Sequence, residues 1–134
     1  MKHITVSAAV IHRTNPQNQV HEIFSTARGY GDYKGWWEFP GGKLEVNESP
    51  EKCIVREIQE ELTAKIQVEQ KLGTVEYDYP EFHLTMHCFL CSVVEGELKL
   101  LEAEAAQWLS KEDLHSVNWL PADLLILDKV KDIL

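Results

Sequence analysis

Apolar residues along the chain recur at two different periods, that of a strand and that of a helix. Five segments predict β-strands, on their apolar and β-branched composition and on the turn residues between them. These are residues 2–12, 20–26, 65–79, 82–94 and 98–101. In the fourth segment Phe82, Leu84 and Met86 fall on one face and His83 and His87 on the other, as the two-residue period of a strand requires.

One segment has a strong helical period. Residues 50–62 are mostly good helix formers with no glycine among them. Apolar residues recur at every fourth position and form a stripe that can pack against a core, at Ile54, Ile58 and Leu62. Ser49 is a suitable N-cap, and Pro50 fits the first helical position because its missing N–H has no partner there. The pattern predicts a helix over 50–62.

Two more helices are predicted near the end of the chain. Ser110 is expected to cap a short helix through Leu114, and Pro121 is expected to begin a last helix. Four apolar residues of this last helix are spaced to bury one side, namely Leu124, Leu127, Val130 and Leu134. Strands interrupted by helices, without repeats or a linker, predict a single α/β domain over residues 1–134 with a mixed sheet.

Three glutamates crowd one side of the helix predicted at 50–62. Glu57, Glu60 and Glu61 stand at i, i+3 and i+4, where like charges repel and destabilise an isolated helix. A bound cation would explain the crowding, and Mg²⁺ takes oxygen ligands and bridges to phosphates. A solvated acidic face is the ordinary alternative. The fixed spacing of a glycine pair, Gly41-Gly42, and of Arg56 relative to these glutamates favours a metal site.

The stretch from Gly42 to Ala64 resembles the Nudix box, G-x5-E-x7-R-E-U-x-E-E-x-G-U, in which U is a bulky aliphatic residue. The matching positions are Gly42, Glu48, Arg56, Glu57, Glu60 and Glu61. Only the last glycine departs, since Thr63 stands in its place. The resemblance extends over nearly the whole chain. It implies a Nudix-type α/β/α sandwich and the hydrolysis of a phosphoric anhydride.

The resemblance also implies roles for individual residues, with Mg²⁺ as the cofactor and Mn²⁺ as an alternative ion. The implied metal ligands are the carbonyl of Gly41 and the carboxylates of Glu57, Glu60, Glu61 and Glu102. Glu104 is the alternative to Glu102, for which an exposed loop charge is an equal explanation. The implied catalytic residues are Glu57, Glu60 and Arg56, with Glu57 first as general base. A turn at Gly41-Gly42 is expected to approach the metal, while Gly42, Glu48 and Arg56 support the loop against the helix.

Within the family, residues 37–43 and 120–123 resemble MutT-type enzymes, which convert nucleoside triphosphates to monophosphates and pyrophosphate. This implies nucleotide-pool sanitation, with 8-oxo-dGTP or cytidine nucleotides as substrates. Arg28 lies in a glycine-punctuated loop, 27–36, and resembles a phosphate-binding arginine. Phe39, Trp36 and Tyr33 are the candidates for stacking on the base.

Asp123 stands at a position that resembles the place of an asparagine in the 8-oxo-dGTP enzymes. An ionised aspartate only accepts hydrogen bonds and therefore favours a base with an exocyclic amine, such as cytosine. A protonated aspartate can instead donate to an oxo-purine. The plain alternative is an aspartate in the first turn of a helix, where the helix dipole favours a negative charge.

Two other functions remain open from the sequence. One is hydrolysis of a dinucleoside polyphosphate or a nucleotide sugar. The other is a non-catalytic Nudix domain that senses a nucleotide. Silent domains generally lose glutamates of the box, and this chain retains all of them, which favours an enzyme.

Composition limits the partners. The chain has 134 residues, 44% of them hydrophobic, and a net charge of −9, which argues against polymeric nucleic acid and anionic membranes. No apolar run has membrane-spanning length, and the three cysteines suit reduced thiols, so a cytoplasmic protein is expected. Cys88 and Cys91 should lie on opposite faces of a strand and not share a metal. The sequence leaves monomer and homodimer open.

Overall fold

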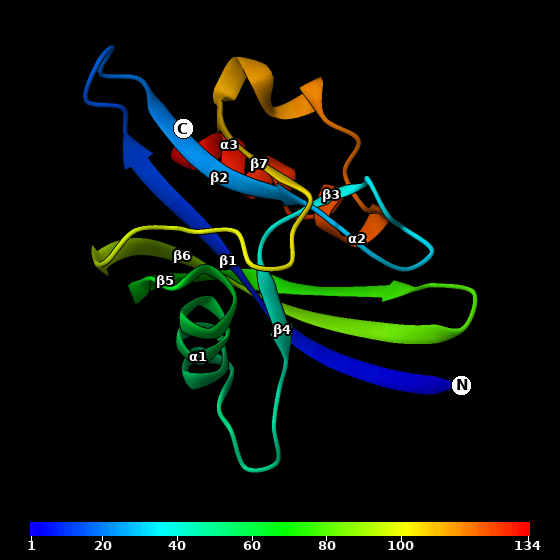
Figure 1. Cartoon of the computed structure of the whole chain (residues 1–134). Helices are drawn as coiled ribbons and strands as arrows, with labels where there is room; N and C mark the ends of the chain where they lie inside the picture. Colours follow the sequence, from blue (N-terminus) through cyan, green and yellow to red (C-terminus); the bar gives the residue numbers. More distant parts are fainter.

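A mixed β-sheet lies between helices in the computed structural model, which describes residues 1–134 (Figure 1). Its strands are β1 (Lys2–Thr14), β2 (His21–Ala27), β3 (Trp37–Glu38), β4 (Gly41–Lys43), β5 (Lys65–Asp78), β6 (Phe82–Glu95) and β7 (Ala105–Ser110). The helices are α1 (Pro50–Leu62), α2 (Pro121–Leu124) and α3 (Leu127–Ile133), with a 3₁₀ helix, η1, at Lys111–Ser116. No helix combines the length and the apolar composition that crossing a membrane requires.

The sheet is built around β1. The strand order is β3-β2-β1-β6-β5, with β4 also paired to β1 and β7 to β2. Strands β1 and β6 are parallel, and all other pairs between these strands are antiparallel. Strand β1 changes partner along its length, because residues 6–8 pair with β4 and residues 12–14 pair with β2. Strands β2 and β4 therefore occupy different stretches of β1, and residues of both line the cavity described below.

Two hydrophobic cores form on the two faces of the sheet. The larger holds 18 buried residues, including Val10 of β1 and Val130 of α3. The smaller holds 9 and joins the sheet to Ile54 and Ile58 of α1. The alternation of side chains along β6 places Cys88 in the larger core and Cys91 in the smaller one. The three layers and the mixed sheet confirm the predicted α/β fold class.

Two predictions near the end of the chain are wrong. Residues 98–101 form no strand. Their segment runs past the end of α1 and is attached there by one backbone hydrogen bond, from Lys99 N–H to Leu62 O (2.8 Å). Leu101 is 61% exposed, so this segment is not part of the sheet or its core. The strand β7 lies further on, where alanines gave no strand signal. The last helix is also not continuous.

The break in the last helix follows from its hydrogen bonds. After Leu124 the backbone bonds tighten from i→i+4 to i→i+3, as in the 3.2 Å bond from Ile126 N–H to Asp123 O. This turns the chain, so that Leu127 and Val130 remain buried while Leu124 is 47% exposed, against expectation. The tightening also leaves Asp123 facing the interior, at 4% exposure.

Helix α1 ends at Thr63 in the left-handed conformation that the family pattern reserves for glycine. The φ and ψ angles of Thr63 are 61° and 17°, and its N–H donates to Gln59 O at 3.2 Å. This conformation places roughly 1–2 kcal/mol of strain on a residue with a Cβ. The Thr63 hydroxyl donates to Glu97 O at 3.1 Å, which offsets part of that strain.

Replacing Thr63 should separate these two effects. Thr63→Ala and Thr63→Gly both remove the hydroxyl, but only the glycine removes the strain. Thr63→Gly should therefore be more stable than Thr63→Ala by about 1 kcal/mol or more in urea unfolding. Equal stabilities would show that position 63 carries no strain. Hydrolytic activity should not respond to either change, because Thr63 does not line the cavity.

Candidate active site

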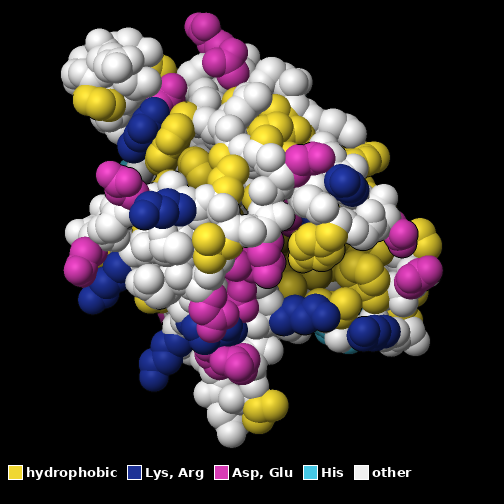
Figure 2. Space-filling model, in the orientation of Figure 1, with side chains coloured by type: hydrophobic (Ala, Val, Ile, Leu, Met, Phe, Trp, Pro, Cys, Tyr) yellow, Lys and Arg dark blue, Asp and Glu magenta, His cyan; other side chains and the backbone are white.

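One cavity of about 640 Å³ opens beside α1 and brings together most of the residues singled out from the sequence. Those that line it are Arg28, Tyr33, Phe39, Gly41, Gly42, Glu57, Glu61, Glu102 and Asp123. Figure 2 shows acidic side chains gathered beside a hollow lined with hydrophobic ones. Five sequence candidates do not line the cavity, namely Trp36, Glu48, Arg56, Glu60 and Glu104.

Three carboxylates meet at the acidic side of the cavity. Glu57 and Glu61 stand one turn apart on α1, and Glu102 comes from the loop before β7. Burial and the nearby negative charges of Glu57 and Glu102 raise the pKa of Glu61 to about 8. A set of crowded oxygen donors is what a hard divalent cation binds, so these residues fit the Mg²⁺ that the family resemblance implies.

The loop before β7 is fixed by close packing on a glycine. A Cβ on Gly29 would lie 2.5 Å from Glu102 O, so only glycine allows the loop to approach β2 this closely. Glu104 N–H donates to Ala27 O at 2.9 Å in the same contact. The result is that Glu102 lines the cavity and Glu104 does not. Of the two alternatives left by the sequence, the structure favours Glu102.

The Gly41-Gly42 pair is part of strand β4 and not a turn, which corrects the sequence-based expectation. The pair lies opposite Ala8 and Ser7 of β1. Neither glycine has a positive φ, so conformational freedom is not the reason for glycine here. A Cβ on Gly41 would lie 1.9 Å from Ser7 O, and one on Gly42 would lie 2.2 Å from the carboxyl carbon of Glu57. Gly41 needs to be glycine because a Cβ would meet backbone atoms of β1, whereas a side chain at position 42 would have to displace the carboxylate of Glu57.

Arg56 joins the loop before α1 to the helix. Its Nε and Nη2 donate to Glu48 at 2.7 and 3.0 Å, and its Nη2 also donates to Lys43 O at 3.1 Å. Its Nη1 donates to Glu57 at 2.9 Å and to Glu60 at 3.1 Å. The bond from Arg56 is the main reason that the pKa of Glu48 falls to about 2. Arg56 therefore orients Glu57, while Glu60, which is 58% exposed, turns toward Arg56 and away from the cavity.

Arg28 enters the cavity already paired with an acid. Its Nη2 and Nε donate to the two carboxylate oxygens of Glu38 at 2.7 and 3.1 Å, a bidentate arrangement. The antiparallel register of β2 and β3, with Thr26 opposite Glu38, brings the two side chains together. Sequence analysis gave Glu38 no role, and no local signal connects it to Arg28, which lies just after strand β2. A phosphate bound by Arg28 would share the guanidinium with Glu38.

Asp123 lines the cavity from the start of α2, outside the box. Its Oδ2 accepts a hydrogen bond from Phe39 N–H at 2.9 Å. Burial, and secondly the charge of Glu38, raise the pKa of Asp123 to about 8. The carboxyl group is therefore mainly protonated at neutral pH. Because Oδ2 accepts from Phe39, the proton belongs on Oδ1.

Comparisons with known proteins identify the family of the chain. The NUDIX domain family matches residues 3–130. The chain belongs to the Nudix family. The 8-oxo-dGTP diphosphatase of Escherichia coli K12 is 33% identical over 132 residues, which are 98% of this chain and 98% of that protein. The CTP pyrophosphohydrolase of the same strain is 30% identical over 128 residues, 96% of this chain and 91% of that protein.

Solved structures of similar proteins, among them that of a MutT NUDIX hydrolase from Burkholderia pseudomallei, have the same fold. The solution structure of the E. coli ORF135 protein has a TM-score of 0.80 at 30% identity and covers 99% of this chain and 91% of that one. With the family match and the two relatives, this confirms the resemblance drawn from the sequence and identifies the chain as a Nudix hydrolase.

Aromatic residues outside the Nudix box form a wall of the cavity, and sequence analysis proposed one of them, Tyr33, but missed Tyr79 and Phe82. Tyr79 and Phe82 are stacked with ring centroids 5.0 Å apart, and Tyr33 meets Tyr79 at 5.6 Å. The hydroxyl of Tyr79 accepts a hydrogen bond from Ala122 N–H at 3.2 Å. The alternation along β6 placed Phe82 on an apolar face but did not show that this face lines a cavity. Trp36 packs against Tyr33 outside the cavity.

The absence of space at Gly42 leads to a prediction for Nudix activity. Gly42→Ala should displace the carboxylate of Glu57 and lower kcat by about 10- to 100-fold, because small misplacements of reacting groups have effects of this size. Gly73→Ala is the matched control, since its new methyl group would come close only to the flexible end of Lys129 (2.9 Å to Nζ) and would make an ordinary contact with Ile126 Cδ1 (3.6 Å). Steady-state rates of the two variants test this, with circular dichroism as a check on folding. Equal rates in both would show that Glu57 has room to move.

Proposed function

We propose that this Nudix hydrolase converts a nucleoside triphosphate, of the 8-oxo-dGTP or cytidine type, to the monophosphate and pyrophosphate. The observation that carries the proposal is one continuous cavity with the carboxylates of the box at one side and Asp123 with aromatic side chains at another. A cavity of about 640 Å³ falls in the range of small-molecule sites. The two E. coli relatives named for 8-oxo-dGTP and CTP support both bases.

The phosphates belong at the acidic side. Glu57, Glu61, Glu102 and the carbonyl of Gly41 would hold Mg²⁺, or Mn²⁺ in its place. When bound, the ion supplies neutralisation of phosphate charge and a more acidic water. Glu57, oriented by Arg56 at 2.9 Å, is the proposed general base. Glu60 is a further proposed ligand that must exchange its bond to Arg56 for the ion, and Arg28 is the proposed phosphate contact.

The base belongs beside Asp123. Phe39 is buried against Trp119 (4.7 Å between ring centroids), so its main role is to hold the carboxyl group through its backbone N–H. Tyr33 and Phe82 line the cavity, are only half-buried, and offer aromatic surface for stacking. With its proton on Oδ1, Asp123 presents a donor to a base carbonyl. When ionised, it presents an acceptor to an amine such as cytosine N4.

Product analysis tests the proposed function. A panel of 8-oxo-dGTP, CTP, dCTP, the common triphosphates, a dinucleoside polyphosphate and a nucleotide sugar would be incubated with Mg²⁺ or with EDTA. Separation of the products by ion-exchange chromatography should show monophosphate and pyrophosphate from 8-oxo-dGTP or a cytidine triphosphate, only with the metal. Preferred cleavage of the last two compounds would replace this proposal with the alternative hydrolase. Tight binding with no turnover would replace it with a sensor.

A further inference from the structure

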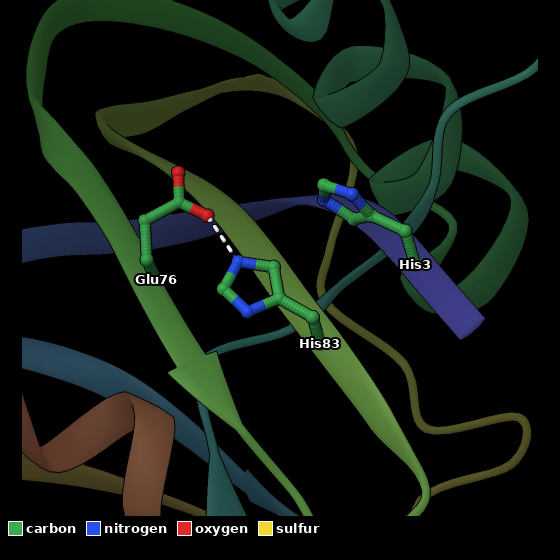
Figure 3. A group of neighbouring side chains, drawn as sticks. All are labelled: His3, Glu76 and His83. Carbon is green, nitrogen blue, oxygen red and sulfur yellow. Dashed lines mark hydrogen bonds and ion pairs between the residues drawn. The ribbon is translucent and has the colours of Figure 1, made fainter. Parts of the chain in front are cut away.

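A second group of metal-ligating side chains lies on the sheet, outside the hydrolytic cavity. His3 of β1, His83 of β6 and Glu76 of β5 come from three neighbouring strands and converge at one place (Figure 3). The parallel register places His3 beside His83, and the antiparallel register places Asp78 opposite His83 and Glu76 opposite Thr85. These positions fall on one face because strand side chains alternate.

The three side chains are close enough to share one ion. One potential ligand atom of each lies within 4.8 Å of the others. Glu76 Oε1 is 2.7 Å from His83 Nε2 and accepts from the Thr85 hydroxyl at 2.6 Å, and that hydroxyl oxygen is 2.8 Å from His3 Nε2. The cluster is thus already assembled by its own hydrogen bonds, with Glu76 Oε1 at its centre.

The cluster is separate from the hydrolytic site. Ile4, Leu84 and Phe82 line the cavity, whereas their neighbours His3 and His83 point to the opposite face of the sheet. None of the three ligating residues lines the cavity. An ion bound here would therefore not touch the nucleotide directly.

We propose that His3, Glu76 and His83 bind one divalent transition-metal ion of the zinc class. Two imidazoles and one carboxylate suit Zn²⁺, whereas Mg²⁺ prefers oxygen ligands alone. His83 Nδ1 is hydrogen-bonded to Asp78 Oδ1, which leaves Nε2 to face the other ligands. A carboxylate behind a ligating histidine fixes the ring and its tautomer in known zinc sites, so Asp78 is the positioning residue.

Binding needs only small side-chain movements. Ligands about 2.0–2.2 Å from zinc in a tetrahedron are about 3.3–3.6 Å apart. Glu76 Oε1 and His83 Nε2, which are 2.7 Å apart, must therefore separate slightly, while ligand atoms that lie further apart, within 4.8 Å, must approach by up to roughly an ångström. His3 and Glu76 are exposed and have room to do so, and water supplies the fourth position. The bound ion would connect β1, β6 and β5 at the end of the sheet where β1 begins. Amide hydrogen exchange at the start of β1 should then become slower.

Calorimetric titration with ZnCl₂ tests the proposal, on metal-free protein without a histidine tag. Excess MgCl₂ is kept in the buffer to occupy the carboxylates of the Nudix box. One zinc ion should bind per chain. His3→Gln and His83→Gln should each raise the Kd for zinc by more than about 100-fold, and Asp78→Asn should raise it by about 10- to 100-fold. Replacing zinc with Co²⁺ should give the visible absorption of a four-coordinate site that includes nitrogen ligands.

His87→Gln is the matched control, because His87 lies on the same strand and face about 13 Å further along. Its zinc affinity should equal that of the wild type. Circular dichroism of all variants separates loss of a ligand from loss of folding. Zinc binding that survives both His3→Gln and His83→Gln would overturn the proposal. Binding removed instead by Glu61→Gln would assign the ion to the Nudix box, and an absence of binding by the wild type would also overturn the proposal.

Discussion

Glu57→Gln should lower kcat by about a hundredfold or more on any good substrate while leaving the fold intact. The change removes the negative charge of the proposed base and metal ligand, and losses of such transition-state contacts typically have effects of this size. The side chain lies in the cavity at 13% exposure and contributes little to either core, so stability should change little. The measurement is kcat with saturating Mg²⁺, together with the melting temperature.

Two further variants complete this experiment. Glu51→Gln removes a charge from an exposed position of the same helix and should not alter kcat. Glu60→Gln tests whether Glu60 leaves Arg56 to bind the metal. A loss similar to that of Glu57→Gln would support Glu60 as a ligand, while a loss below about tenfold would leave it a partner of Arg56 alone. Near wild-type rates in both the Glu57 and Glu60 variants would contradict the metal assignment.

Asp123 should make the choice of base depend on pH. Its pKa is raised from an ordinary 3.8 to about 8, so the folded protein holds the neutral acid below about pH 8 and the ionised form above it. The neutral acid donates to an oxo-purine, and the ionised form accepts from cytosine N4. The ratio of kcat/KM for CTP to that for 8-oxo-dGTP should therefore rise as pH passes through about 8. A mismatched pair contributes about 1–3 kcal/mol, so the ratio should change by about 5- to 150-fold.

Asp123→Asn should remove this pH dependence. Its carbonyl oxygen can still accept from Phe39 N–H, which leaves the NH₂ group to donate into the cavity at every pH. The variant should favour 8-oxo-dGTP relative to CTP, and Asp123→Ala should flatten the preference without stopping hydrolysis. Asp128→Asn, an exposed aspartate at the start of α3, is the control. A ratio that is the same in all four proteins and at every pH would reduce Asp123 to a helix-start residue.

The same pKa shift affects stability in a direction that can be checked without a substrate. Between about pH 4 and pH 8 the folded state keeps the proton of Asp123 and the unfolded state does not. The free energy of unfolding should fall as pH rises through this range, because the folded state binds more protons there. Asp123→Asn should show a smaller fall than the wild type. Urea unfolding at several pH values measures it.

The elements with the strongest local patterns were predictable from the sequence. The apolar stripe and the Ser49-Pro50 start define α1 to the residue, and the long apolar and β-branched segments give β1, β5 and β6. The elements that were missed are held by distant partners. The alanine-rich β7 is a strand because it pairs with β2, and β4 is a strand because Gly41 and Gly42 fit against β1. Leu98 to Leu101 had an apolar pattern but no partner strand.

The residues of the candidate site likewise divide into those that the sequence could predict and those that it could not. The spacing of the Nudix box predicted roles for the glutamates of α1 and for Arg56, because these residues lie within a few helical turns of one another, and two of the glutamates, Glu57 and Glu61, line the cavity. Glu38, Tyr79 and the packing of Gly29 against the Glu102 loop were not predictable, since each depends on strand pairing or loop packing. His3 and His83 show the same limit. A strand register that no local pattern reveals brings them together.

The parallel pairing of β1 with β6 also bears on how the chain folds as it is made. Lys2 lies opposite Phe82 and Ile11 opposite Cys91. Strand β1, the first to be synthesised, can therefore pair with β6 only after β6 has also been synthesised. At roughly 5–20 residues per second, a ribosome needs several seconds to bridge that interval. During this time the apolar stretch Ala8–Ile11 has no β6 to pair with, and such unpaired strands are prone to aggregate. Non-local pairing of this kind also slows folding, so nascent chains of this protein should depend on chaperones more than a helical bundle of the same length would.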